Sequence, residues 1–258
     1  NYDCLEVLSR IPENSIDMIF ADPPYMLSNN GFTCQNGRMA TVNKGGWDKS
    51  NGFEEDALFH NEWIANCRRV LKPEGTIWIS GTYHSIYQCG YLLQKNGFHI
   101  LNDIAWYKPN ASPNLSCRFF TASHETLIWA RKDKKAKHTF NYDKMKNGSF
   151  PEDKLKKENT QMRSVWSIPT PSKQEKEYGK HPTQKPLGLL TRIITASTNS
   201  GDIILDPFNG GGTTGVACNL IGGRFYIGIE IDKMFCELTK KKMREFESDF
   251  TEVMYAQR

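Results

Sequence analysis

A turn with three consecutive glycines joins an apolar run to a helical pattern in the C-terminal third of the chain. The stretch LDPFNGGGTTG, residues 205–215, follows the apolar residues of DIILD and contains Gly210, Gly211 and Gly212. Glycine tolerates positive φ and lets a ligand approach the backbone closely. A strand that turns directly into a helix in this way is the site where doubly wound sheets bind nucleotides. The spacing is neither G-x-G-x-x-G nor a phosphate-binding loop, so the turn alone is weak evidence of a nucleotide-like ligand.

The remainder of the chain alternates between strand and helix patterns. Strands are expected at residues 16–21, 76–80, 98–108, 125–132, 202–206 and 224–232. Helices are expected at residues 4–10, 54–71, 84–97, 186–201, 213–222 and 233–248. This alternation predicts an α/β fold with a doubly wound, mostly parallel sheet. Residues 26–52 have no periodicity and are expected to form a long loop.

Composition limits the class of protein. A chain of 258 residues suits one sizeable α/β domain with an insertion, or two small domains. No run approaches the roughly 18 apolar residues of a membrane span. The first ten residues have neither the basic start nor the apolar core of a signal peptide, and the abrupt start suggests that residues before Asn1 are missing. The odd number of cysteines, seven with no C-x-x-C pair, favours a reducing cytoplasm over disulfides or a zinc ribbon.

Positive charge is concentrated in one segment. The chain carries a net charge of +4, but residues 131–180 alone carry +7 and the rest carries −3. A local excess of this kind indicates contact with a polyanion. The alternative, a solvated loop region with no partner, stays open at this point.

A second motif, DPPY, ends the apolar run at residues 16–21. The two prolines terminate the strand and fix the backbone, so that the Asp22 carboxylate and the Pro23 carbonyl become two acceptors with set directions. Tyr25 offers a flat face on which a base can stack. This arrangement suits an exocyclic amino group on a flat heterocycle. Glu230, at the end of the strand after the glycine turn, is suited to bind ribose hydroxyls, and together the turn and Glu230 favour a cofactor that contains adenosine.

The motifs DPPY, HPTQKP, DPF-x-G-x-GTT and GIE, in this order, resemble those of β-class amino-methyltransferases, which act on DNA with S-adenosylmethionine. The resemblance implies a Rossmann-like methyltransferase fold with a seven-stranded sheet, a circularly permuted motif order and a DNA-recognition insertion. It also implies a catalytic half at residues 1–132, a target-recognition insertion at 133–180 and a cofactor-binding half at 181–258.

The resemblance assigns roles to individual residues. The catalytic residues it implies are Asp22, Pro23, Pro24 and Tyr25. The S-adenosylmethionine-binding residues it implies are Asp3, Cys4, His181, Pro182, Thr183, Lys185, Asp206, Phe208, Gly210, Gly212, Thr213, Glu230 and Ile231. The chain departs from the family pattern at Tyr2, where a glycine usually precedes the acidic residue, and at Gly211, where many members have serine.

Two longer stretches, KPNASPNLSCRFFTASHETLIWARK and GGWDKSNGFEE, are similar to the second, β-class adenine methyltransferase of DpnII-type restriction–modification systems. Members of that group modify GATC, and relatives accept single-stranded DNA. This likeness implies a bacterial or phage-encoded enzyme of the cytoplasm. Its partners would be double-stranded and single-stranded DNA, a second copy of the chain and a cognate restriction endonuclease. The residues expected to contact DNA are Lys44, Trp47, Lys49, Lys108, Asn110, Arg118, Lys134, Lys135 and Lys137.

The implied reaction is direct attack by the N6 amino group of a flipped adenine on the methyl group of the cofactor. N4-cytosine methylation is the main alternative, although Asp at the first motif position is typical of adenine enzymes. Ring-carbon methylation needs a cysteine after a proline, and none of the cysteines has one. An RNA or protein-glutamine methyltransferase would lack HPTQKP, a dehydrogenase would carry G-x-G-x-x-G, and a non-catalytic DNA-binding module would tolerate loss of Asp22. No residues have metal-ligand spacing, so no catalytic metal is expected.

Overall fold

The structure is a computed structural model that describes residues 2–28, 32–35, 38–41, 45–152 and 157–246. Its centre is a seven-stranded sheet with the order β7-β5-β6-β4-β1-β8-β9. The strands are β1 (Ile16–Ala21), β4 (Leu71–Gly81), β5 (His99–Tyr107), β6 (His124–Arg131), β7 (Val165–Ser167), β8 (Ile203–Asp206) and β9 (Phe225–Gly228). Within this sheet β6 runs antiparallel to both of its neighbours, and the other pairs are parallel. The predicted doubly wound, mostly parallel sheet is confirmed.

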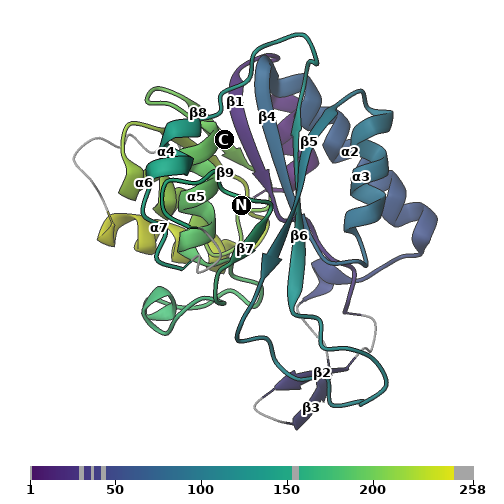
Figure 1. Ribbon diagram of the computed structural model, residues 1–258. Helices are drawn as coiled ribbons and strands as arrows, with labels where there is room; N and C mark the ends of the chain where they lie inside the picture. Colours follow the sequence, from purple (N-terminus) through teal and green to yellow (C-terminus); the bar gives the residue numbers. More distant parts are fainter. Residues whose placement is uncertain (1, 29–31, 36–37, 42–44, 153–156, 247–258) are drawn as a thin grey trace.

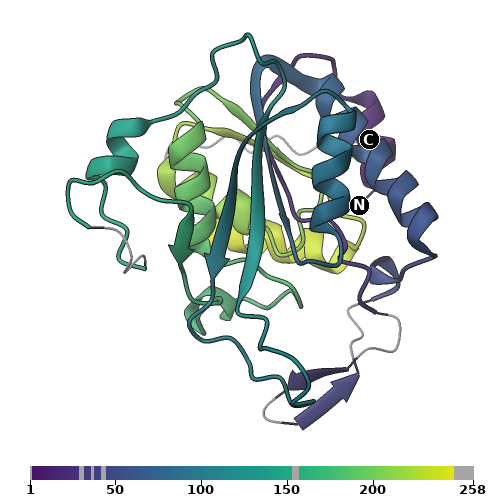
Figure 2. The ribbon, with the colours of Figure 1, turned by 45° about the vertical axis from the view of Figure 1, so that its right-hand side comes forward.

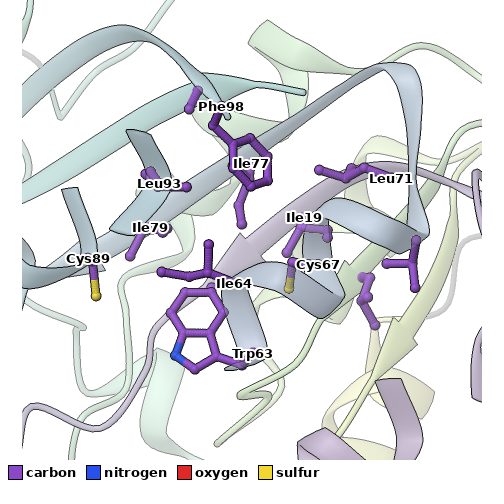
Figure 3. Close-up of a cluster of buried hydrophobic side chains, with 14 of the residues drawn as sticks. Ile19, Trp63, Ile64, Cys67, Leu71, Ile77, Ile79, Cys89, Leu93 and Phe98 are labelled. Atoms are coloured by element: carbon purple, nitrogen blue, oxygen red, sulfur yellow. The ribbon is translucent and has the colours of Figure 1, made fainter. Parts of the chain in front are cut away.

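Helices cover both faces of the sheet (Figures 1 and 2). They are α1 (Cys4–Arg10), α2 (Phe53–Val70), α3 (Ile86–Lys95), α4 (Tyr142–Asn147), α5 (Leu187–Ser197), α6 (Thr213–Ile221) and α7 (Lys233–Glu245). Alternate residues of β1 point to opposite faces, as a strand requires. Ile19 packs with α1, α2 and α3, whereas Met18 and Phe20 pack with α5 and α6. Figure 3 shows the first of these clusters, where Trp63 and Ile64 of α2 face the sheet.

Residues 26–52 are more regular than expected. They contain a hairpin of β2 (Phe32–Gln35) and β3 (Arg38–Thr41), and a short 3-10 helix, η1 (Gly46–Asp48). The hairpin lies away from the main sheet, at its lower end in Figure 1. The expectation of one long loop was therefore wrong in this part, because strands of four residues are too short to show a periodic pattern.

The basic segment at residues 133–180 also contains regular structure, namely α4, β7 and a second 3-10 helix, η2 (Gln174–Lys176). Its strand β7 is an outermost strand of the main sheet and pairs with β5. None of these short elements was predicted, since three to six residues carry too little periodicity. No helix in the part of the chain that the structure describes is long and apolar enough to cross a membrane.

Gly212 illustrates how the glycine turn is fixed. It precedes α6 as the N-cap with φ +77°, and a β-carbon at this position would lie 2.6 Å from Cγ2 and Oγ1 of Thr239. Real β-carbons do not come so close to other atoms. Both the packing of Thr239 in α7 and the positive φ therefore require glycine at this position.

We expect Gly212→Ala to lower the free energy of unfolding, measured by urea denaturation, more than Gly201→Ala does. Gly201 also has a positive φ, +90°, but nothing lies within 4 Å of a β-carbon there. The control therefore reports backbone strain alone, and the clash with α7 should add about 1–3 kcal/mol. Equal losses of unfolding free energy in the two variants would show that Thr239 moves aside without destabilising the protein.

Candidate active site

One edge of the sheet collects the polar residues of both motifs. The carboxyl ends of β1, β4, β8 and β9 meet there, and β6, being antiparallel, brings its first residues to the same place. We call this the carboxyl edge. A cavity of about 270 Å³ opens beside it. Its lining includes Tyr2, Asp3, Cys4, Asp22, Pro23, Pro24, Tyr25, Trp47, Asp48, Phe59, His181, Thr183, Gln184, Lys185, Asp206, Phe208, Gly210, Thr213, Glu230 and Ile231.

Asp22 is the first residue after β1 and is bound from two sides. The Lys185 ammonium donates to Oδ2 at 2.5 Å, and the Tyr25 hydroxyl donates to Oδ1 at 2.8 Å. The prolines between Asp22 and Tyr25 turn the chain so that both side chains reach the same space. Lys185 was assigned to cofactor binding by sequence, but the structure places its ammonium at the DPPY corner.

Glu125, the second residue of β6, is the other carboxylate of this corner, and sequence reasoning missed it. The Tyr25 hydroxyl lies 2.9 Å from its Oε2, and the Lys185 ammonium lies 3.6 Å away. Lys108, at the end of β5, donates to Oε1 at 3.1 Å, and Ser80 of β4 donates to Oε2 at 3.4 Å. Because a phenol has one proton, Tyr25 can donate to only one of the two carboxylates at a time.

Burial and charge act in opposite directions on these groups. Burial raises the pKa of Asp22, and the Lys185 ammonium opposes that rise. Burial acts to lower the pKa of Lys185, but the carboxylates of Asp22 and Glu125 outweigh it, so the net shift is upward and the ammonium stays charged. Burial would raise the pKa of Glu125, but Lys185 and Lys108 overcome it and hold the value at about 2. The Lys185 ammonium and the Glu125 carboxylate are therefore both charged at neutral pH.

A third carboxylate fixes the backbone of the motif. Asp48 in η1 is fully buried, and its Oδ1 accepts the backbone N–H of Tyr25 at 3.0 Å. Its Oδ2 accepts the Ser28 hydroxyl at 2.8 Å. Asp48 was also missed by sequence reasoning, because nothing in GGWDKS distinguishes a buried aspartate from a solvated one.

The glycine turn is tied to the acidic residue after β9. Glu230 accepts the backbone N–H of Gly210 at 2.8 Å and that of Asp232 at 2.9 Å. Gly210 has φ +52°, and a β-carbon there would lie 3.2 Å from Nδ1 of His181. The turn and the HPTQKP segment thus form a narrow cradle that a larger side chain at position 210 would fill.

Aromatic rings form another part of the cavity wall. Trp47 stacks on His181 with ring centroids 5.8 Å apart, which links η1 to the HPTQKP segment. Phe208 packs edge-on against Trp63 at 5.3 Å and against Phe59 at 6.3 Å. Such walls suit the flat, apolar part of a ligand.

The cavity also holds a surplus of carboxylates. Asp206 is fully buried and accepts the Thr214 hydroxyl at 2.6 Å and the Phe208 backbone N–H at 3.0 Å. Burial, with a smaller contribution from the carboxylates of Asp22 and Glu230, raises its pKa to about 7, and the hydrogen bonds from Thr214 and Phe208 oppose that rise. With Asp3 and Glu230 also in the lining, the cavity suits a ligand that carries positive charge.

Not every residue assigned to cofactor binding lines the cavity. Pro182 is exposed, and Gly212 lies against Thr239 of α7. Asp3 lines the cavity and also serves as the N-cap of α1, where its Oδ1 accepts the backbone N–H of Leu5 at 2.8 Å.

The residues expected to contact DNA lie in different places. Trp47 lines the cavity, and Lys49 and Arg118 are exposed at the same end of the molecule. Lys108 is paired with Glu125, and Asn110 exchanges two hydrogen bonds with Thr170. Lys44 lies outside the described residues.

Lys134, Lys135 and Lys137 do not lie near the cavity. They follow Arg131, the last residue of β6, which pairs with Thr76, five residues before the end of β4 at Gly81. Because β6 is antiparallel, this is the opposite edge of the sheet, six residues or about 20 Å from Glu125. Figures 1 and 2 show the segment at the end far from the β2–β3 hairpin. The assignment of these three lysines to the DNA interface stays a prediction, and their distance from the cavity argues against it.

Comparison with known proteins gives consistent matches. A family model for N6 and N4 enzymes, described as DNA methylase, matches residues 16–241. The type II methyltransferase M2.MboI of Moraxella bovis is 52% identical over 94% of this chain and 86% of its own length. The type II methyltransferase M2.DpnII of Streptococcus pneumoniae is 51% identical over 93% of this chain and 87% of its own.

Solved structures have the same fold. The complex of M1.HpyAVI with SAM is 30% identical with a TM-score of 0.68, and the match covers 94% of this chain and 97% of that one. The PvuII cytosine-N4-specific DNA methyltransferase reaches a TM-score of 0.72 over 93% of this chain and 84% of its own, at 18% identity. That identity supports a shared fold and nothing finer.

We expect Asp206→Asn to raise the midpoint of thermal unfolding, and to do so more at pH 8 than at pH 5. Between its unfolded pKa near 4 and its folded pKa of about 7, Asp206 keeps its proton only when folded. Stability is therefore lost as pH rises through this range, at about 1.4 kcal/mol per unit. Asparagine cannot ionise and avoids this loss.

The matched control is Asp103→Asn on the exposed surface of β5. Its effect on the unfolding midpoint should be small and similar at both pH values. A gain in Asp206→Asn that does not change between pH 5 and pH 8 would contradict the raised pKa.

Proposed function

The chain belongs to the N6/N4 DNA methylase family, and we propose that it transfers a methyl group from S-adenosylmethionine to the N6 amino group of adenine in DNA. The observation that carries this proposal is the DPPY corner. Asp22 of this corner lines the same cavity as the glycine turn and Glu230. An amino-group acceptor and a nucleoside-binding turn side by side are what such a transfer needs.

The Asp22 carboxylate and the Pro23 carbonyl would accept the two N–H bonds of the target amino group. The nitrogen lone pair of adenine is delocalised into the ring, and two acceptors allow the nitrogen to become pyramidal and nucleophilic. The same oxygens stabilise the positive charge that develops on the nitrogen. Asp22 need not act as a full general base, because the proton can leave to solvent after methyl transfer.

The cavity has the features that S-adenosylmethionine requires. When bound, this cofactor supplies an electrophilic methyl group on a positively charged sulfur. Glu230 would bind its ribose hydroxyls, and the backbone of Gly210 leaves room in the cradle beside His181. The carboxylates of Asp206 and Asp3 suit its positive charges, and Phe208 offers an apolar wall.

Lys185 must move for the target base to bind. Its ammonium lies 2.5 Å from Asp22 and 5.2 Å from the centroid of the Tyr25 ring, the two surfaces proposed for the base. Glu125, at 3.6 Å, is a second anion to which the ammonium can shift without leaving the corner. In this scheme Lys185 binds the Asp22 carboxylate in the free enzyme and releases that oxygen as an acceptor when the base arrives.

Adenine is favoured over cytosine by the aspartate of DPPY, since N4-cytosine enzymes more often have serine there. GATC is the first sequence to test, because the chain resembles the DpnII-type group. An RNA or protein amino-methyltransferase is the less favoured alternative, and the match over residues 16–241 to DNA methylases argues against it. Residues 133–180, with β7 beside the carboxyl edge, are proposed to contribute to target recognition.

DNA is proposed to lie against the carboxyl edge, where the target base has to enter. Among the described residues, exposed lysines at this edge include Lys49 beside η1, and Lys173 and Lys180 in the segment that leads from β7 to the HPTQKP motif. These residues replace Lys134, Lys135 and Lys137 as the expected phosphate contacts. The opposite edge, where those three lie, serves as an internal control.

A homodimer and a cognate restriction endonuclease remain proposals. The cognate endonuclease is supported by the names of the relatives, which are type II methyltransferases. The homodimer is supported by α3, where Tyr87 and Tyr91 lie one turn apart and are 76% and 65% exposed. A row of exposed aromatic side chains on one helix suits a protein interface.

The proposed reaction is tested by incubating the protein with S-adenosylmethionine and duplexes that contain GATC, followed by mass spectrometry of the released nucleosides. We expect N6-methyladenine in the wild type and a fall in kcat of at least about 100-fold in Asp22→Ala, as for the loss of one transition-state acceptor. Lys185 retains Glu125 in this variant, so its circular dichroism should match the wild type. N4-methylcytosine as the product would contradict the adenine assignment.

The DNA surface is tested with two triple variants that remove equal charge. Lys49→Gln/Lys173→Gln/Lys180→Gln should weaken duplex binding and flatten the slope of log K against log salt by about 0.9 for each phosphate that the variant no longer neutralises. Lys134→Gln/Lys135→Gln/Lys137→Gln should leave both quantities close to those of the wild type in fluorescence anisotropy. If the second set weakens binding as much as the first, the placement of DNA at the carboxyl edge is wrong.

A further inference from the structure

The loop that joins β5 to β6, residues 108–123, presents two adjacent phenylalanines to solvent. Phe119 is 68% exposed and Phe120 is 96% exposed. Leu115 on the same loop is also exposed. Large apolar side chains that gather on one short segment of a protein surface usually mark a binding site. We call Phe119 and Phe120 the phenylalanine tip.

Hydrogen bonds hold the loop in a defined shape. The backbone N–H of Lys108 donates to the carbonyl of Ser123 at 2.7 Å and closes the base of the loop. The Asn114 side chain donates to the carbonyl of Phe119 at 2.8 Å and so holds the backbone of the tip itself. The loop is therefore a built projection whose apolar end points away from the protein core.

The loop starts and ends at the proposed catalytic corner. Lys108 and Glu125, which flank it, form an ion pair at 3.1 Å, and Glu125 contacts Tyr25. Phe119 is six residues from Glu125, so the two are at most about 20 Å apart. In both Figures 1 and 2 the loop lies beside the β2–β3 hairpin, beyond the carboxyl edge. A duplex bound at this edge would meet the phenylalanine tip.

The charge of the loop also suits nucleic acid. Residues 109–123 contain no aspartate or glutamate, and their one charged side chain is Arg118, next to the tip. An arginine beside exposed aromatic rings can bind a phosphate while the rings contact bases.

We propose that Phe119 and Phe120 insert into the DNA duplex beside the target base and stack on the bases that remain, while Arg118 binds an adjacent phosphate. This rests on the proposed function, in which the target base leaves the helix to reach Asp22. Extrusion of a base breaks its stacking and pairing, and an inserted aromatic ring restores stacking in the gap. The phenylalanine tip would therefore promote flipping and would contribute nothing to the chemical step.

The test compares Phe119→Ala/Phe120→Ala with the wild type on three substrates. These are a fully paired GATC duplex, the same duplex with an abasic site opposite the target adenine, and the single strand. We expect the double variant to lose at least tenfold in kcat/KM on the paired duplex, and less than threefold on the other two substrates, where the adenine is already unpaired. Leu115→Ala, at the same loop but outside the tip, should lose less than threefold on all three.

A second measurement uses 2-aminopurine at the target position, whose fluorescence rises when the base unstacks. The double variant should show a smaller rise than the wild type on the paired duplex, and a Phe119→Trp/Phe120→Trp variant should restore it. Equal loss on paired and unpaired substrates would overturn the proposal, as would no loss at all or a change in oligomeric mass. Failure of the proposed function itself would appear differently, as a wild type that methylates none of the three DNAs.

Discussion

A buried ion pair between Lys185 and Asp22 joins the two halves of the chain at the point where the chemistry is proposed. The partners are 163 residues apart in sequence, and their charged atoms are 2.5 Å apart. Burial of two charges costs desolvation energy that their attraction repays only in part, so such a pair contributes little net stability. The pair instead contributes by holding two distant segments of the chain in place. It fixes the DPPY corner against the segment that carries His181, and its ammonium opposes the rise in the pKa of Asp22 that burial causes.

The same corner explains why Glu125 matters. With Glu125 present, Lys185 has two anions within reach and Tyr25 has two acceptors for one proton. Such an arrangement can change its hydrogen bonds without exposing an uncompensated charge. A site that must exchange an internal partner for a substrate benefits from a second anion of this kind.

The surplus of carboxylates has a cost in stability. Asp206 stays buried among other acids because a cationic ligand is expected to neutralise the cavity, and in the absence of such a ligand its pKa is about 7. A residue that cannot ionise would make the folded protein more stable but would bind a cationic ligand less well. Such a conflict between stability and binding is common at functional sites.

Local sequence determined most elements and the two motif positions. The strand before Asp22 and the turn at Gly210 could be predicted, because apolar periodicity, paired prolines and consecutive glycines act within a few residues of where they stand. The β2–β3 hairpin and β7 could not, because strands this short depend on their partners. Asp48 and Glu125 could not either, since burial of a carboxylate is decided by neighbours that are distant in sequence.

Tertiary structure decided which residues share the site, and the direction of β6 is the clearest case. The sequence placed a strand at residues 125–132 but said nothing of its direction. In the structure it runs antiparallel between β4 and β5, so its first residues reach the carboxyl edge and its last residues the opposite one. That reversal brings Glu125 to the catalytic corner and removes Lys134, Lys135 and Lys137 from it. Strand direction follows from how the whole sheet assembles, and side-chain patterns, which read the same in both directions, cannot report it.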